Sequence, residues 1–422
     1  MSGTWPALQP WVEDVLGARV VEVTRLSAGN SRIVWKAMVQ GADGAVRPFA
    51  VRCETGSGPL SGTALSLNRE QTVYAALAGQ GLAVPRLRAV SPAGDALITD
   101  WAEGDDRWRP ELLAPYLREL AKLHTLNVSE LSLPGFATHS RADIDLWWDV
   151  HRQKAARPSP FVEFARDVLL ECHPGEGPLV LCHGDPGPAN FLHDGRHVTA
   201  LLDWEFAHVG DVHDDLAWIA VRAWMFGVTI PDFADEVRDV YGRRLPQMAL
   251  DPGRLAYWQA VVLMRNLIIV LSAIEHGRPG RGRFVHLSLR PALQWALLVQ
   301  VATVAGLPVP ELSAAPTVSR PGGDVMKEIA LGLTELLPSV QNDADATRRT
   351  KLMHRLADQL ATTWESGTAS AASHSSAPGA GRHEATAGRE DRLHALAETA
   401  AAELSPFPRA VRMTRTPLPT LR

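Results

Sequence analysis

Two apolar runs on either side of a short polar loop are the sequence feature that most limits how this chain can fold. Residues 178–206 read PLVLCHGDPGPANFLHDGRHVTALLDWEF, in which LVLC and VTALLDW flank a loop of Asp, Gly, Pro and Asn. Short apolar runs bounded by turn residues predict strands. A short hairpin of this kind would bring Asp185, Asn190 and Asp203 to one edge.

The rest of the chain changes character near residue 101. VVEVTRL, SRIVWKAMV, RPFAVRCE and ALITDW predict strands, with a turn at GADG and one helix at LNREQTVYAALA. Beyond residue 101 helical spacing dominates, as in LLAPYLRELAKLHTL. The pattern predicts an α+β fold in which a small strand-rich lobe precedes a larger helical lobe.

Composition excludes several classes of protein. A formal net charge of -5 gives no electrostatic reason to expect nucleic acid or an anionic membrane as partner. Three widely spaced cysteines indicate neither a zinc site nor a disulfide framework, and they favour a cytoplasmic location. Residues 1–20 contain no basic start followed by an apolar run, so we expect no secretory signal. The apolar stretch 260–274 carries Arg265 and Asn266, which predicts a buried helix and no membrane span.

Asp185, Asn190 and Asp203 are the strongest candidates for chemistry. Phosphoryl transfer needs a carboxylate to accept the proton of the attacking hydroxyl, and ligands that fix Mg²⁺ on the nucleotide phosphates. Magnesium prefers oxygen ligands, which carboxylates and amides supply. Taken singly, these residues would be ordinary turn residues or a strand cap. Their order between two apolar strands favours a phosphotransferase site.

The pair LCHGDPGPANFL and ALLDWEFAHVGDVHDDLAWIA resembles the aminoglycoside phosphotransferase family of the protein-kinase-like superfamily. The likeness covers about residues 20–305 and is greatest to the branch that includes domains attached to some acyl-CoA dehydrogenases. It implies a two-lobed kinase-like fold, with a nucleotide-binding lobe at 1–101 and a catalytic, acceptor-binding helical lobe at 102–312.

The resemblance also implies roles for the residues of the motif. It makes Asp185 the catalytic base, and Asn190 and Asp203 the metal ligands. His183 supports the geometry of the loop. Asp215 either braces the loop or is a plain helix N-cap, and the sequence leaves both readings open.

The nucleotide, ATP or GTP, would lie against the first lobe. The resemblance places Gly29, Asn30 and Ser31 in a loop over its phosphates, and it pairs a cation on the third strand, Arg52, with a helix carboxylate, Glu70. The connector ALITDWAEG would lie beside the purine, with Asp100 and Trp101 next to the base.

The acceptor site is the least defined. Asp211, Arg222 and Arg265 are candidates by position only. The loop departs from many relatives, because PGPA carries no basic residue that could stabilise the transferred phosphate. No acidic cluster suited to a polycation is evident, so an aminoglycoside is not favoured. A hydroxyacyl thioester or another lipid-derived alcohol is the first expectation and a macrolide or other antibiotic the second.

The C-terminal region predicts an addition to this fold. Residues 313–324 read as a linker, and 325–422 as a helical region with a disordered stretch at about 366–389, rich in Ser, Ala, Gly and His. These helices could bind a protein partner. The alternative to an enzyme is a nucleotide-binding pseudokinase that acts as a scaffold or regulator through them.

Overall fold

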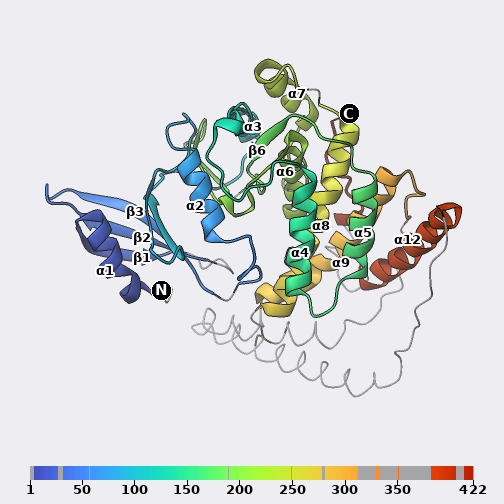
Figure 1. Cartoon of the computed structure of the whole chain (residues 1–422), viewed down its shortest axis with the longest axis horizontal. Helices are drawn as coiled ribbons and strands as arrows, with labels where there is room; N and C mark the ends of the chain where they lie inside the picture. Colours follow the sequence, from blue (N-terminus) through green and yellow to red (C-terminus); the bar gives the residue numbers. More distant parts are fainter. Residues whose placement is uncertain are drawn as a thin grey trace. The chain divides into compact units, whose positions relative to one another are not determined.

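The computed structural model describes most of the first 311 residues and two segments near the C-terminus (Figure 1). The described residues are 4–26, 32–56, 58–188, 190–248, 250–277, 281–311, 382–404 and 413–421, with the single positions 329, 331 and 350. They form two compact units. The first comprises residues 1–157, 169–265 and 417–422, and the second comprises 158–168 and 266–416.

A five-stranded antiparallel sheet opens the first unit. Its strands lie in the order β1-β2-β3-β5-β4, with bounds β1 Arg19–Arg25, β2 Arg32–Gln40, β3 Val46–Glu54, β4 Leu87–Val90 and β5 Ala96–Asp100. β2 and β3 pair along their whole length, from Arg32 opposite Glu54 to Gln40 opposite Val46, across the predicted turn. The four strands expected from sequence are confirmed, whereas β4 was not foreseen.

Helix α1, Trp5–Leu16, covers one face of this sheet (Figure 1). Leu8 and Val12 are fully buried in one cluster with Val39, Val51 and Ile98 of the strands. Each such side chain contributes roughly 1.5–3 kcal/mol by leaving water. Helix α1 therefore stabilises the sheet by covering the apolar side chains on one of its faces. Sequence patterning missed α1, which contains an internal proline.

Two short two-stranded ribbons follow, and their pairing differs from the expected hairpin. β6, Leu179–Cys182, pairs with β9, His208–Asp211, while β7, Phe191–His193, pairs with β8, Val198–Leu201. The two apolar runs therefore do not pair with each other. The first run, in β6, pairs with β9, and the second, in β8, pairs with β7. Both partner strands are too short to show a recognisable strand pattern in the sequence.

Helices make up most of the remaining described chain. The first unit contains α2 Leu67–Ala76, α3 Leu113–His124, α4 Arg141–Lys154, α6 Val212–Phe226, α7 Phe233–Arg244, the greater part of α8 Pro252–His276, and short 3₁₀ turns η1 Pro110–Leu112, η2 Val128–Glu130 and η3 Trp204–Phe206. The second contains most of α5 Pro160–Glu171, α9 Arg281–Ala305 and α12 Arg382–Leu404. The predicted α+β class is confirmed.

Helix α8 is long and apolar enough to cross a membrane by length and composition. Of its apolar window, 83% is buried in the structure. A core helix passes the same composition test, and the burial agrees with the buried helix expected over residues 260–274.

The structure bears on the predicted disordered stretch but not on the predicted linker or lobe boundary. α12 begins at Arg382, so residues 382–389 of the stretch expected to be disordered are helical, because the helix of the last apolar segment extends toward the N-terminus. Residues 366–381 and the linker at 313–324 lie outside the described residues. The contacts do not divide the chain at residue 101, and the lobe boundary there stays a prediction.

Candidate active site

The loop that joins β6 to β7 presents Asp185. Gly184 allows this loop to approach Phe206 closely. The φ angle of Gly184 is +81°, and a Cβ at this position would lie 1.9 Å from the carbonyl oxygen of Phe206. Only glycine fits such a contact. The loop is thereby pressed against η3, which directly follows Asp203.

The carboxylate of Asp185 is held from two sides. Arg222 Nη1 donates a hydrogen bond to Oδ1, and Asn190 Nδ2 donates to Oδ2 at 2.7 Å. Burial raises the pKa of Asp185, the Arg222 guanidinium opposes this, and the Asp203 carboxylate lies near enough to raise it further. The result is a fixed carboxylate whose ionised form is stabilised mainly by one arginine.

His183 supports the loop and is not placed as a base. Its Nε2 donates to the carbonyl of Leu202 at 2.9 Å, so Nδ1 carries the lone pair that accepts the Asp185 N–H at 3.4 Å. The ring lies 4.4 Å from that of Trp204, centroid to centroid. Burial lowers the pKa of His183, which favours this neutral form. The contacts agree with the supporting role implied by the resemblance.

Asp215 braces the same loop from α6. Its carboxylate accepts the backbone N–H of His183 at 2.8 Å and of Gly184 at 2.9 Å, and it accepts His124 Nε2 at 2.9 Å. The N-cap of α6 is Asp211, whose side chain accepts the His213 N–H. Of the two readings left open, the brace is therefore correct.

Asn190 and Asp203 come together at the open end of the β7–β8 ribbon. Phe191 pairs with Leu201, and the Leu202 N–H donates to the carbonyl of Asn190 at 2.9 Å. Asp203 adopts a left-handed backbone with φ +70°, and its side chain is 34% exposed. Strained backbone in a non-glycine residue is concentrated at functional sites. The predicted gathering of Asp185, Asn190 and Asp203 agrees with this geometry.

These residues fit a hard divalent cation. The NH₂ group of the Asn190 amide donates to both the side chain and the backbone carbonyl of Asp185, so these two hydrogen bonds do not use its oxygen. Arg52 Nη2 binds Oδ1 of Asp203 at 2.7 Å, whereas Oδ2 makes no hydrogen bond with any of the described residues. An amide oxygen and a carboxylate oxygen are ligands that Mg²⁺ accepts.

Asp203 belongs to a network of two arginines and three carboxylates. The predicted pair of Arg52 with Glu70 is confirmed at 2.7 Å. Arg32 contacts the other oxygen of Glu70 at 2.9 Å, Asp203 at 3.7 Å and Glu205 at 3.0 Å. Burial opposes the charge of Asp203, but Arg52 and Arg32 outweigh it and lower its pKa, while burial raises the pKa of Glu205 to about 8.

Sequence reasoning missed Arg32 and Glu205. A signal for Arg32 did exist, because Arg52 lies opposite Val34 in the β2–β3 register and Arg32 is two residues from Val34. Residues two apart on a strand share a face, so the two guanidiniums were bound to be diagonal neighbours. No such rule links Glu205 to this pair.

The other nucleotide-side residues lie apart from this network. Asp100 forms an ion pair with Arg88 at 2.6 Å, and the Lys36 ammonium lies 4.3 Å over the Trp101 ring. Their predicted place beside a purine stays a prediction. Gly29, Asn30 and Ser31 lie outside the described residues.

Of the three acceptor candidates, Arg222 alone contacts Asp185. Asp211 is buried and pairs with His213 and Arg254, and Arg265 is 1% exposed and pairs with Asp143 and Asp214. Their positions in the sequence suggested an acceptor role, but both charges are neutralised inside the fold. We therefore correct the prediction for Asp211 and Arg265.

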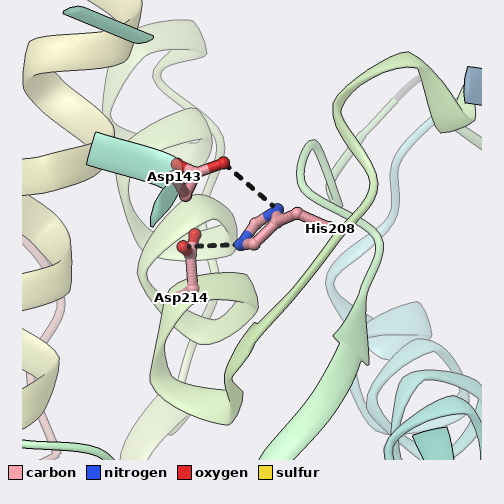
Figure 2. A group of neighbouring side chains, drawn as sticks. All are labelled: Asp143, His208 and Asp214. Atoms are coloured by element: carbon pink, nitrogen blue, oxygen red, sulfur yellow. Dashed lines mark hydrogen bonds and ion pairs between the residues drawn. The ribbon is translucent and has the colours of Figure 1, made fainter. Parts of the chain in front are cut away.

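Asp143, His208 and Asp214 form a second cluster, with His208 between the two carboxylates (Figure 2). Arg265 binds both carboxylates, at 2.6 and 2.7 Å to Asp214, so it already supplies a cation there. His208 Nδ1 faces the carbonyl of Phe206 at 3.0 Å and Nε2 faces Asp214 at 3.0 Å. Both ring nitrogens thus face acceptors, as in an imidazolium. Two cations balance two anions, and the cluster does not suit a metal ion.

Comparison with known proteins agrees with this geometry. The profile of the Phosphotransferase enzyme family (APH) matches residues 23–258, more than half of the chain. The chain belongs to this family. It is accordingly a small-molecule phosphotransferase, and the predicted family is confirmed.

Solved structures support the fold. The crystal structure of aminoglycoside phosphotransferase APH(4)-Ia is 20% identical, with a TM-score of 0.51 over 71% of this chain and 99% of that one. A thermostable mutant of the same enzyme, in a ternary complex with ADP and hygromycin B, is 20% identical with a TM-score of 0.50 over 70% and 98%. The kinase-like α+β fold expected from sequence is thus confirmed.

One curated relative is similar over a short part. Acyl-CoA dehydrogenase family member 11 of Pongo abelii is 28% identical over 115 residues, which are 26% of this chain and 15% of that protein. The matched segment spans less than a sixth of the relative, and the activity of the whole relative is not carried over.

Proposed function

We propose that this phosphotransferase moves the γ-phosphate of ATP or GTP to a hydroxyl of a small molecule, with Asp185 as base. One observation carries the proposal: a carboxylate that is only 14% exposed, fixed by Arg222 and Asn190, interacts electrostatically with Asp203, which two arginines contact. Asp185 would accept or orient the proton of the hydroxyl, and its fixed geometry would hold that oxygen toward the phosphate.

Asn190 and Asp203 would hold Mg²⁺ on the nucleotide. The bound ion would neutralise phosphate charge. Arg52, locked by Glu70, would present its guanidinium to phosphate oxygens, for which its planar fork is well suited. Glu70 is fully buried, so its charge serves mainly to fix the arginines.

The acceptor that we favour is a hydroxylated, partly apolar molecule. Arg222, which binds Asp185, lies over the ring of Phe226 at 5.2 Å, and that ring is 53% exposed. The positive charge of Arg222 suits a polycation poorly. A hydroxyacyl thioester or lipid-derived alcohol is the first candidate and a macrolide the second.

The solved relative that binds ADP and hygromycin B agrees with a nucleotide donor and a hydroxylated acceptor in general terms. Cytoplasmic location, lack of nucleic-acid and membrane partners, and a protein partner for the C-terminal helices remain predictions.

The test measures release of nucleoside diphosphate by the full chain with Mg²⁺ and either ATP or GTP. It screens hydroxyacyl-CoAs, macrolides and aminoglycosides as acceptors. Asp185→Asn should lower the rate about 10²–10⁴-fold, the usual contribution of a general base, and chelation of divalent ions should abolish the reaction.

Asp194→Asn is the matched control. Asp194 is a half-exposed aspartate in the β7–β8 turn that bonds only with neighbours in the turn, so its substitution should leave the rate unchanged. Equal rates for wild type and Asp185→Asn would contradict the proposal and favour the pseudokinase alternative.

A further inference from the structure

The catalytic loop lacks a cation of its own and receives one from a helix. Residues 186–189 read PGPA and contain no basic side chain. Arg222, in α6, is 37 residues from Asp185 along the chain, yet its Nη1 binds the Asp185 carboxylate. We propose that Arg222 is a positioning residue that holds the Asp185 carboxylate from α6, in the space that Gly187 leaves open; this rests on the proposed phosphotransfer.

Gly187 makes room for the arginine. Its φ is +150°, and a Cβ there would lie 2.8 Å from Cδ and 3.1 Å from Nε of Arg222. A side chain at position 187 would therefore collide with the stem of Arg222. The Gly187 N–H also donates to the Tyr116 hydroxyl at 2.8 Å, which fixes the backbone at this place.

Arg222 ties the carboxylate to the loop around it. While Nη1 binds Asp185, Nη2 donates to the carbonyl of Pro188 at 3.0 Å. A guanidinium can span two acceptors in this way because its donors form a rigid fork, which a lysine lacks. The Asp185 carboxylate is then held at Oδ1 by α6 and at Oδ2 by Asn190, so its plane cannot turn.

The cost of this placement indicates what it serves. The side chain of Arg222 is 11% exposed, and its Nε is buried without a hydrogen-bond partner among the described residues. A buried unpaired donor lowers stability. The position of Arg222 thus allows contacts with Asp185 and Pro188 although its Nε is left without a hydrogen bond.

The experiment compares Arg222→Met with Arg254→Met in the full chain. Arg254 is a matched control, since it also pairs with an aspartate, Asp211, and donates to two backbone carbonyls. The assays are release of ADP from Mg-ATP with water as acceptor, and the affinity for Mg-ADP measured by calorimetry. Loss of a fixed orientation should lower kcat by about 10²-fold in Arg222→Met, with Mg-ADP affinity unchanged.

Arg254→Met should keep the wild-type kcat per folded molecule. Free guanidinium should restore part of the rate in Arg222→Ala but not in Asp185→Asn, because only the first variant leaves a gap for it. Arg222→Lys keeps the positive charge but lacks the planar fork of donors, so its kcat should lie between those of Arg222→Met and the wild type.

Either of two results overturns the inference: Arg222→Met with the wild-type kcat, or a rate loss that a parallel loss of Mg-ADP affinity explains. If Asp185→Asn is inactive while Arg222→Met is not, this inference alone fails. If Asp185→Asn hydrolyses Mg-ATP at the wild-type rate, the proposed function fails and this inference with it.

Discussion

Two clusters in the first unit combine arginine with carboxylates and differ in exposure. The site network has two arginines against Glu70, Asp203 and Glu205, and Asp203 is partly exposed. The cluster of Asp143, His208, Asp214 and Arg265 is buried throughout and balanced by the imidazolium of His208. An accessible carboxylate oxygen in the site network suits an added cation, whereas a closed set with no exposed oxygen serves the fold.

The largest effect should come from breaking the closed cluster. Arg265→Met would leave two buried carboxylates facing one imidazolium, and breaking a buried pair costs about 3–5 kcal/mol. We expect urea unfolding to show this loss while kcat per folded molecule stays near wild type. If Arg265→Met had wild-type stability, the buried cluster would not be the one of the two clusters that stabilises the fold.

The site network should respond in the opposite way. Asp203→Asn removes the carboxylate that would hold the metal, which contributes several kcal/mol to catalysis, so kcat should fall by about 10²-fold or more. Stability should change far less than in Arg265→Met. Nucleoside diphosphate release at saturating Mg²⁺ measures the first quantity and urea unfolding the second.

A pH series separates the clusters more finely. Burial lowers the pKa of His208, but Asp143 and Asp214 outweigh it and raise the pKa above the ordinary value of 6.5. The stability that His208 adds is thus complete below about pH 6.5 and is lost as pH rises through its folded pKa. The difference in unfolding free energy between wild type and His208→Gln should shrink over that range. A difference that grows with pH would contradict the imidazolium.

The smallest effect belongs to the exposed pair of Arg88 and Asp100. Both side chains are 36% exposed, and such pairs contribute about 0–1 kcal/mol. Arg88→Ala should leave the unfolding free energy almost unchanged, and the small difference should vanish in high salt. If Arg88→Ala lowered the unfolding free energy as much as Arg265→Met, exposed and buried ion pairs would not differ in this protein as we expect.

The parts of the site that sequence could predict are local. Asp185 and Asn190 share one loop, and Asp203 ends the ribbon that the loop enters, so spacing and turn chemistry bring them together. Arg52 and Glu70 followed from the family pattern.

What sequence could not predict depends on distant pairings. β6 pairs with β9 and not with β8, and Arg265 meets Asp143 across 122 residues. Arg265 was rightly placed in a buried helix, but its partners, and hence its structural role, have no local signature. The contact of Arg222 with Asp185 likewise depends on where α6 packs.

The left-handed backbone of Asp203 has a consequence for laboratory evolution. Asn and Gly occupy that conformation more readily than most residues. A screen that rewards heat resistance alone would accept either residue at position 203 wherever the relief of backbone strain offsets the lost ion pair with Arg52, and it would not register the accompanying loss of turnover. Selection on this enzyme should therefore score product formation in every round.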